Sequence, residues 1–171
     1  ILELNRQGIF VIEEYACIIL RKLLTPFSVG YVDLQSPAGA INSVIVYNYD
    51  GSVYVSDEAR MLAGNNDFTF RLGHVQENSY EELFYGTKAQ ELALVWANES
   101  LPGCSECGFQ SICGADPVHN HATQGDMVGY RPTNAFCRRN MEIIRYLIEL
   151  MDDTSSDVEQ IFRSWVNNNH S

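Results

Sequence analysis

The chain has 171 residues, of which 46% are hydrophobic, and a formal net charge of −11 from 22 acidic residues against 11 lysines and arginines. This length and composition suit a folded domain with its own core, with or without a smaller lobe. Such an acidic surface repels phosphate backbones, which excludes nucleic acid as a partner. No apolar run approaches the ~18 residues of a membrane span, so we expect no membrane contact.

The start of the chain and its cysteines indicate origin and compartment. The chain opens Ile-Leu-Glu-Leu, without an initiator methionine and without the basic region of a signal peptide. We therefore expect it to be a piece of a longer polypeptide. Five cysteines are present, an odd number, and most of them are clustered. This pattern disfavours a disulfide framework and favours a metal in a reduced compartment, so we expect a cytoplasmic protein.

The first expected element is a helix over residues 5–24. Apolar residues recur there at intervals of three and four, and charged residues fall mainly on other positions. Cys17 lies within this helix, and a lone thiol of this kind is typically a small buried residue rather than a ligand. Pro26 ends the helix region. Residues 25–42 are predicted to be an irregular linker with a short strand at 31–34.

A β-hairpin comes next. Runs of β-branched and aromatic residues at 43–48 and 53–56 flank the dipeptide Asp50-Gly51, which is a strong hairpin signal in that setting. A lone hairpin is only marginally stable in water. We therefore expect it to pack on a helix or on a third strand, for which residues 68–75 are the candidate.

Four further helices are expected, each marked by apolar spacing or by a capping pattern. They cover residues 57–62, residues 79 to about 98, residues 134–151, and a short segment that begins at 156. Ser79 and Ser156 open capping boxes, and Thr133 is expected to cap the long helix that follows it. The fold predicted from these elements is α+β, with a small antiparallel hairpin or sheet packed with several helices around a four-cysteine metal site.

The spacing of four cysteines is the most specific signal in the sequence. Cys104, Cys107 and Cys113 follow the pattern C-x2-C-x5-C, and Cys137 follows after a long polar loop. Four thiolates that converge on one point are the donor set of a structural zinc or of one iron–sulfur cluster. Spacing alone favours zinc, although the x5 gap and the unpaired fourth cysteine are less typical of zinc ribbons.

Residues around Cys137 suit a metal site. Cys137 falls in the first turn of its expected helix, where free backbone amides and the helix dipole stabilise a thiolate. Arg138 and Arg139 follow directly and can offset the charge of the thiolates, although an exposed helix face explains them equally well. Other potential ligands lie in the preceding loop, where exposure to solvent is the simpler interpretation. These are Asp116, His119 and His121.

The sequence resembles the SPASM domain, the C-terminal auxiliary-cluster domain of radical SAM enzymes that modify peptides. The matching segments are 50–55, 70–75, the C-x2-C-x5-C cysteines and the distant Cys137. Over nearly the whole chain, including 30–40 and 113–117, the sequence is also similar to the radical SAM maturase of the His-Xaa-Ser system. The implied substrate is a ribosomally synthesised precursor peptide with His-Xaa-Ser repeats.

The resemblance implies one auxiliary [4Fe–4S] cluster, bound by the four late cysteines. A full SPASM domain has seven cysteines and two such clusters, and the first cluster takes cysteines around the hairpin and after the third late cysteine. Ser56 and Pro117 stand at two of those positions, and the segment before the hairpin has no cysteine. We therefore expect one cluster rather than two.

Radical SAM enzymes cleave S-adenosylmethionine at a cluster held by a C-x3-C-x2-C loop, and no such triplet occurs in this sequence. The chain is therefore interpreted as the part that follows the catalytic barrel, and we expect no cleavage of S-adenosylmethionine by this chain alone. Residues 1–42 would be the helix and linker from the end of the barrel, 43–151 the SPASM-like domain, and 152–171 a C-terminal helix and tail. The implied partners are the upstream barrel, the precursor peptide and a partner maturase.

An alternative function uses the same four thiolates. In it, the chain is a zinc-stabilised module that binds a peptide or partner and has no redox role. Zinc can also enter the site in a fragment handled in air, because thiolates accept either metal. A conventional hydrolase is disfavoured, since no G-x-S-x-G, H-E-x-x-H or P-loop motif is present.

Overall fold

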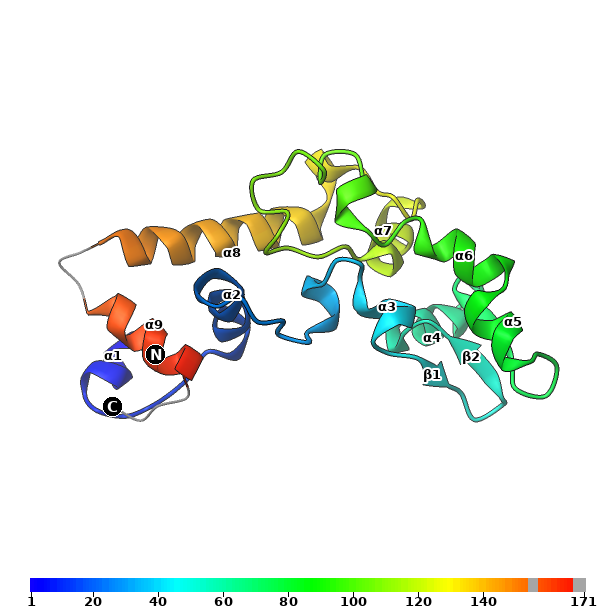
Figure 1. Cartoon of the computed structure of the whole chain (residues 1–171), viewed down its shortest axis with the longest axis horizontal. Helices are drawn as coiled ribbons and strands as arrows, with labels where there is room; N and C mark the ends of the chain where they lie inside the picture. The colour runs from blue at the N-terminus through cyan, green and yellow to red at the C-terminus, as the bar shows by residue number, and fades with distance from the viewer. Residues whose placement is uncertain (154–156, 168–171) are drawn as a thin grey trace. The chain divides into compact units, whose positions relative to one another are not determined.

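The computed structural model describes residues 1–153 and 157–167, and these residues form two compact units (Figure 1). One unit combines Ile1–Val29 with the C-terminal part of the chain from Arg139, and the other is Gly30–Arg138. The α+β class expected from the sequence is confirmed. In the part of the chain that the structure describes, no helix combines the length and the apolar character needed to cross a bilayer.

The unit Gly30–Arg138 contains a three-stranded antiparallel sheet in the order β1-β2-β3. Its strands are β1 (Val46–Tyr47), β2 (Ser52–Tyr54) and β3 (Arg71–His74). The turn between β1 and β2 depends on Gly51, whose φ of 89° is readily adopted only by glycine. The carboxylate of Asp50 accepts a hydrogen bond from the N–H of Ser52 at 2.8 Å, which closes the turn. The hairpin and the third strand are thus confirmed, with shorter strands than expected.

Short helices surround this sheet (Figure 1). They are η1 (Val32–Leu34), α3 (Gly39–Asn42), α4 (Asp57–Ala63), α5 (Tyr80–Tyr85), α6 (Thr87–Ala93), η2 (Asn98–Ser100), α7 (Pro117–Gln124) and η3 (Arg131–Thr133). The strand expected at 31–34 is wrong, because this segment forms the 3-10 helix η1. The capping box that opens at Ser79 is confirmed, but the helix expected from 79 to about 98 ends at Tyr85 and restarts at Thr87, since Gly86 adopts an extended conformation (ψ 171°).

The core of this unit lies between the sheet and the helices that cover it. Val53 and Val55 of the central strand region, Phe70, Leu92 and Trp96 are each at most 1% exposed. Burying side chains of this size contributes about 1.5–3 kcal/mol each relative to the exposed state. These apolar contacts hold the hairpin and α6 around one hydrophobic cluster. The buried Leu101 belongs to the same cluster, and the cysteine-containing loop follows it in the chain.

The other unit is helical, with α1 (Leu2–Arg6), α2 (Glu14–Leu24), most of α8 (Ala135–Asp152) and α9 (Val158–Asn167). A single helix over 5–24 was expected, and this is wrong. Gly8 has a φ of 78°, which ends α1, and the carboxylate of Glu13 accepts a hydrogen bond from the N–H of Ala16 at 2.6 Å, which caps α2.

Helix α9 packs against α2 and α1 in this unit. Cys17 is 2% exposed, as expected for a core residue, and its thiol donates to the carbonyl of Trp165 at 3.5 Å. The indole N–H of Trp165 donates to the side-chain oxygen of Asn5 at 3.2 Å. The second predicted capping box begins at Ser156, which lies outside the described residues.

Candidate metal centre

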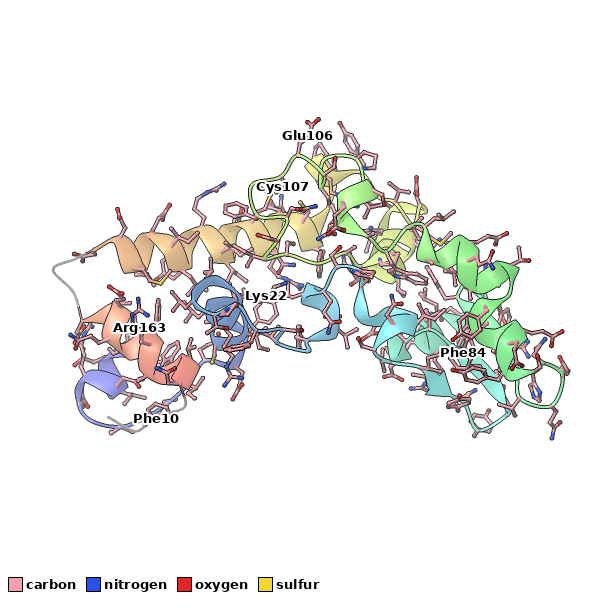
Figure 2. The ribbon with its side chains drawn as sticks, viewed as in Figure 1. Phe10, Lys22, Phe84, Glu106, Cys107 and Arg163 are labelled. Atoms are coloured by element: carbon pink, nitrogen blue, oxygen red, sulfur yellow. The ribbon has the colours of Figure 1, made fainter. Side chains whose placement is uncertain are left out.

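The four late cysteines all lie in the unit Gly30–Arg138. Cys104, Cys107 and Cys113 lie in consecutive turns between η2 and α7, whereas Cys137 lies in the first turn of α8. Figure 2 labels Cys107 in the first of these segments. Backbone hydrogen bonds close these turns, one from Cys107 N–H to Cys104 O at 3.0 Å and one from Cys113 N–H to Phe109 O at 2.9 Å. The tight turns hold the first three thiols on a short stretch of fixed backbone.

The four thiols influence one another electrostatically. Burial raises the pKa of Cys113 to about 11, and the negative charges of Cys137, Cys104 and Cys107 add to the effect. Burial also raises the pKa of Cys104 and of Cys137, again with contributions from neighbouring thiolates. These like charges disfavour the ionisation of Cys104, Cys113 and Cys137. All five cysteines of the chain are thiols rather than disulfides.

The donor set fits a soft metal centre by its chemistry, because thiolates bind zinc and iron–sulfur clusters. Partly buried thiols whose thiolates would repel one another stay protonated unless a cation replaces the protons, which couples metal binding to deprotonation. Among residues 1–153 and 157–167, however, no three or more His, Cys, Asp or Glu side chains are arranged as a metal site. The expected four-cysteine site is therefore not shown, and Cys104, Cys107, Cys113 and Cys137 remain predicted ligands.

Arg131 is the cation that acts on two of these thiols, whereas the sequence suggested Arg138 and Arg139. Its positive charge lowers the pKa of Cys104 and of Cys137, against the larger effect of burial. The Cγ of Arg131 lies 3.0 Å from the point where a Cβ on Gly103 would stand, so a side chain at 103 would displace it. No pattern in the sequence pointed to Arg131, because it reaches the cysteines only through the fold.

Asn134 caps α8 and thereby positions Cys137. Its side-chain oxygen accepts a hydrogen bond from the N–H of Cys137 at 2.9 Å, which is the N-cap interaction that was expected of Thr133. The amide nitrogen of Asn134 donates to the side-chain oxygen of Asn120 at 2.6 Å. Asn120 in turn donates to two carbonyls of the loop after α7. A buried hydrogen-bond network therefore connects the start of α8 with α7.

Helix α7 was missed in the sequence, where residues 114–133 were interpreted as an irregular, solvated loop. Asp116 caps this helix by accepting a hydrogen bond from the N–H of His119 at 2.8 Å, and Pro117 occupies its first position. Gly125 ends it with a φ of 72°. Asp-Pro at the start and glycine at the end are recognised helix boundaries, so the signal was present although the apolar periodicity was weak.

The two histidines of α7 have different surroundings. The Nε2 atom of His121 lies 2.7 Å from a carboxylate oxygen of Asp67, and its ring packs edge-on against Phe70 with 5.4 Å between ring centroids. The Nε2 atom of His119 is buried, has no hydrogen-bond partner among the described residues and belongs to a ring 6.2 Å from that of Phe136. His121 therefore has a structural partner that explains its presence without a metal.

The fold is similar to that of two solved structures of one protein, anSMEcpe. One structure with this likeness is hexahistidine-tagged anSMEcpe with bound AdoMet, which shares 19% identity with a TM-score of 0.56 over 99% of this chain and 42% of that one. Native anSMEcpe with bound AdoMet and the Cp18Cys peptide has the same identity and TM-score over 98% of this chain and 40% of that one. No family model and no curated protein matches the sequence.

The chain spans about two fifths of the length of anSMEcpe, an anaerobic sulfatase-maturating radical SAM enzyme with a SPASM domain. At 19% identity the likeness concerns the fold alone. It therefore supports the resemblance to SPASM-containing enzymes at the level of architecture and leaves the substrate of this chain to be argued separately.

Proposed function

We propose that this chain is the auxiliary-cluster domain of a radical SAM enzyme that modifies a ribosomally synthesised precursor peptide. The likeness to anSMEcpe, a radical SAM enzyme with a SPASM domain, supports this function, and one structure of that protein holds a peptide as well as AdoMet. The observation that carries the proposal is the placement of Cys104, Cys107 and Cys113 in consecutive turns, with Cys137 in the first turn of α8.

Cys104, Cys107, Cys113 and Cys137 would hold one [4Fe–4S] cluster. Such a cluster supplies a one-electron redox centre whose potential depends on nearby charge, hydrogen bonds and solvent access. The protein residues hold and tune it. Arg131 places a positive charge beside the first and last of these thiols, and Asn134 fixes the backbone of Cys137 through its cap. Partial burial of the thiols limits the access of water.

The finer assignment follows the resemblance stated for residues 30–40 and 113–117. We propose the His-Xaa-Ser system, with a precursor peptide of that type as substrate and a partner maturase in the cytoplasm. Residues 1–42 would lead from an upstream barrel that binds S-adenosylmethionine, 43–151 would form the auxiliary-cluster domain, and 152–171 would complete it.

Metal analysis of the anaerobically purified chain tests the proposal. We expect iron and inorganic sulfide in equal amounts and a broad visible absorption band that zinc, with its filled d shell, cannot produce. Cys137→Ala should lose the iron and loosen the loop after Cys113, because metal binding is coupled to folding. Cys17→Ala is the matched control, since this thiol is buried in the other unit, and it should retain the iron.

Two results would contradict the proposal. One zinc per chain without excess iron under anaerobic conditions would favour the zinc-stabilised interaction module. Loss of metal in Cys17→Ala together with its retention in Cys137→Ala would refute the assignment of the ligands.

A further inference from the structure

A groove of about 520 Å³ lies along one side of the sheet, in the unit Gly30–Arg138. One wall is the backbone that leads into β1, residues 41–45, and the other is formed by α5 and α6. Most of the side chains that line the helical wall are apolar or aromatic. They are Tyr80, Phe84, Tyr85, Ala89 and Ala93.

The first wall continues into a strand with an open edge. β1 is the outer strand of the sheet, and β2 covers only one of its sides. Val46 is paired with Tyr54, and the N–H of Asn48 donates to Ser52 O, so the backbone groups of Val46 and Asn48 face β2. Because successive residues of a strand direct their N–H and C=O groups to opposite sides, those of Ile45 and Tyr47 point away from β2. In the described part of the chain, nothing is hydrogen-bonded to these outward groups.

Unpaired strand edges pair readily with another extended chain, and proteins normally cover or charge them. The edge of β1 is neither charged nor covered. Ile45 and Tyr47 have no charge, and the groove separates the strand from α5 and α6. The backbone that leads into β1 is also strained. Ile41 has a φ of 62°, which is rare for a β-branched residue, and its N–H is held by the carbonyls of Val44 and Val55.

Aromatic side chains cluster at the helical wall. The ring of Tyr80 lies 4.6 Å from that of Phe84 and 6.2 Å from that of Tyr85, between ring centroids. Phe84 is partly buried against the core, and Figure 2 shows it beside the strands. Tyr80 and Tyr85 are 60% and 65% exposed. Exposed tyrosines beside a groove are characteristic of surfaces that recognise other polypeptides.

Charge indicates the chemistry of the occupant. On α5 and α6, the carboxylates of Glu81, Glu82 and Glu91 outnumber the single ammonium of Lys88. The whole chain has a net charge of −11, so a basic ligand is attracted to this surface and an acidic one is repelled. The open backbone groups require a partner with free N–H and C=O groups, that is, an extended polypeptide.

We propose that β1 and this groove bind an extended, basic polypeptide segment, which adds to the sheet as a fourth strand and places alternate side chains against α5 and α6. The identity of the natural occupant rests on the proposed function, which makes it the precursor peptide. The geometry of the groove and of the strand edge does not depend on the metal.

The test uses the 171-residue chain and a fluorescein-labelled short peptide of alternating valine and lysine, with binding measured by fluorescence anisotropy. A matched peptide, N-methylated at every residue, keeps the side chains and has no N–H group on either edge to donate to a strand. We expect the N-methylated peptide to bind at least about tenfold more weakly, a difference of about 1.4 kcal/mol. We also expect slower deuterium exchange of the Ile45 and Tyr47 amides when the first peptide is bound.

Two pairs of variants and probes locate the site. Ala93→Trp fills the groove and should weaken binding about tenfold, whereas Leu94→Trp, at a neighbouring position that is 76% exposed and does not line the groove, should bind as the original chain does. A peptide of alternating valine and glutamate should bind more weakly than its lysine counterpart, and added salt should reduce the difference.

Several outcomes would overturn the inference. They are absence of binding, equal binding of the methylated and unmethylated peptides, equal effects of the two tryptophan variants, and equal binding of the acidic peptide. A concentration-dependent dimer that Ala93→Trp abolishes would assign the groove to a second copy of the chain instead. Iron measured on the same samples distinguishes the two proposals. Absence of peptide binding in samples that contain iron contradicts only this inference. Peptide binding in samples that lack iron contradicts only the proposed function.

Discussion

The cap of α8 offers a quantitative test, because Asn134 makes hydrogen bonds with both ends of its side-chain amide. Its oxygen accepts from Cys137 N–H at 2.9 Å, and its nitrogen donates to the side-chain oxygens of Asn120 at 2.6 Å and of Gln124 at 3.3 Å. Asn134 is 2% exposed and Asn120 is 0% exposed, so water cannot replace the bonds with Cys137 and Asn120 in Asn134→Ala. Loss of the cap costs ~1 kcal/mol, and the buried oxygen of Asn120 left without a donor costs ~1–3 kcal/mol.

We therefore expect Asn134→Ala to lower the free energy of unfolding by about 2–4 kcal/mol, a large share of the ~5–15 kcal/mol typical of a domain. Urea unfolding followed by circular dichroism measures this difference. Asn134→Asp separates the two bonds, because a carboxylate still accepts from Cys137 N–H but cannot donate to Asn120. It should lose most of the stability that Asn134→Ala loses.

Thr133→Ala is the control for the cap. Thr133 is exposed, and its hydroxyl contacts only Gln124 and the carbonyl of Tyr130 among the described residues. Its replacement should change the free energy of unfolding by no more than ~0.5 kcal/mol, as for most surface substitutions. If Thr133→Ala costs as much as Asn134→Ala, the cap is Thr133, as the sequence predicted, and the reasoning about the buried network is wrong.

Two further variants probe the surroundings of the cysteines. Gly114→Ala places a Cβ 2.7 Å from the Cα of Leu34 and should destabilise the chain by ~1–3 kcal/mol in urea unfolding, whereas Gly108→Ala, with no atom within 4 Å, should be nearly neutral. The carboxyl pKa of Asp67 is lowered, first by hydrogen bonds from Thr69. The ionised Asp67 carboxylate stabilises the folded chain above the unfolded pKa of about 3.8, and this stabilisation is lost as the pH falls through the lower folded pKa. Asp67→Asn should therefore weaken the dependence of the free energy of unfolding on acid pH, measured by urea unfolding at several pH values.

Local signals predicted the hairpin and its neighbours well. Asp50-Gly51 marks the turn, and the box that opens at Ser79 starts α5, because in both cases the interaction that forms the structure lies within four residues of sequence. The prediction of a single N-terminal helix was wrong for a related reason. The apolar spacing on which the prediction rested begins only after Gly8, and the left-handed conformation at Gly8 and the cap at Glu13 decide the boundary.

The four cysteines of the candidate site stand out in the sequence by their spacing. They stay predicted ligands, because no metal site is shown among the residues that the structure describes. Arg131 and Asn120 could not be found, because each reaches the cysteine region only after α7 and the loop that follows it have folded back on the start of α8. Contacts between residues remote in sequence leave no local pattern.

The positions where a full SPASM domain would bind its first cluster have ordinary structural roles in this chain. Ser56 is 4% exposed and caps α4 by accepting a hydrogen bond from the N–H of Ala59 at 3.2 Å. Pro117 is buried in the first turn of α7, where its missing N–H and fixed φ suit a helix start. Both residues therefore begin helices at the positions where cysteines would bind a metal.

The two helices that start at these positions also contact each other. α4 packs against α7, and Asp67, which follows α4, lies 2.7 Å from His121 of α7. Each helix cap, and the hydrogen bond to the charged Asp67 carboxylate, contributes on the order of 1 kcal/mol to the free energy of unfolding. Helix caps and one charge-assisted hydrogen bond thus connect the segments that the first cluster of a full SPASM domain would join. This explains how α4 and α7 stay together without cysteines at these positions.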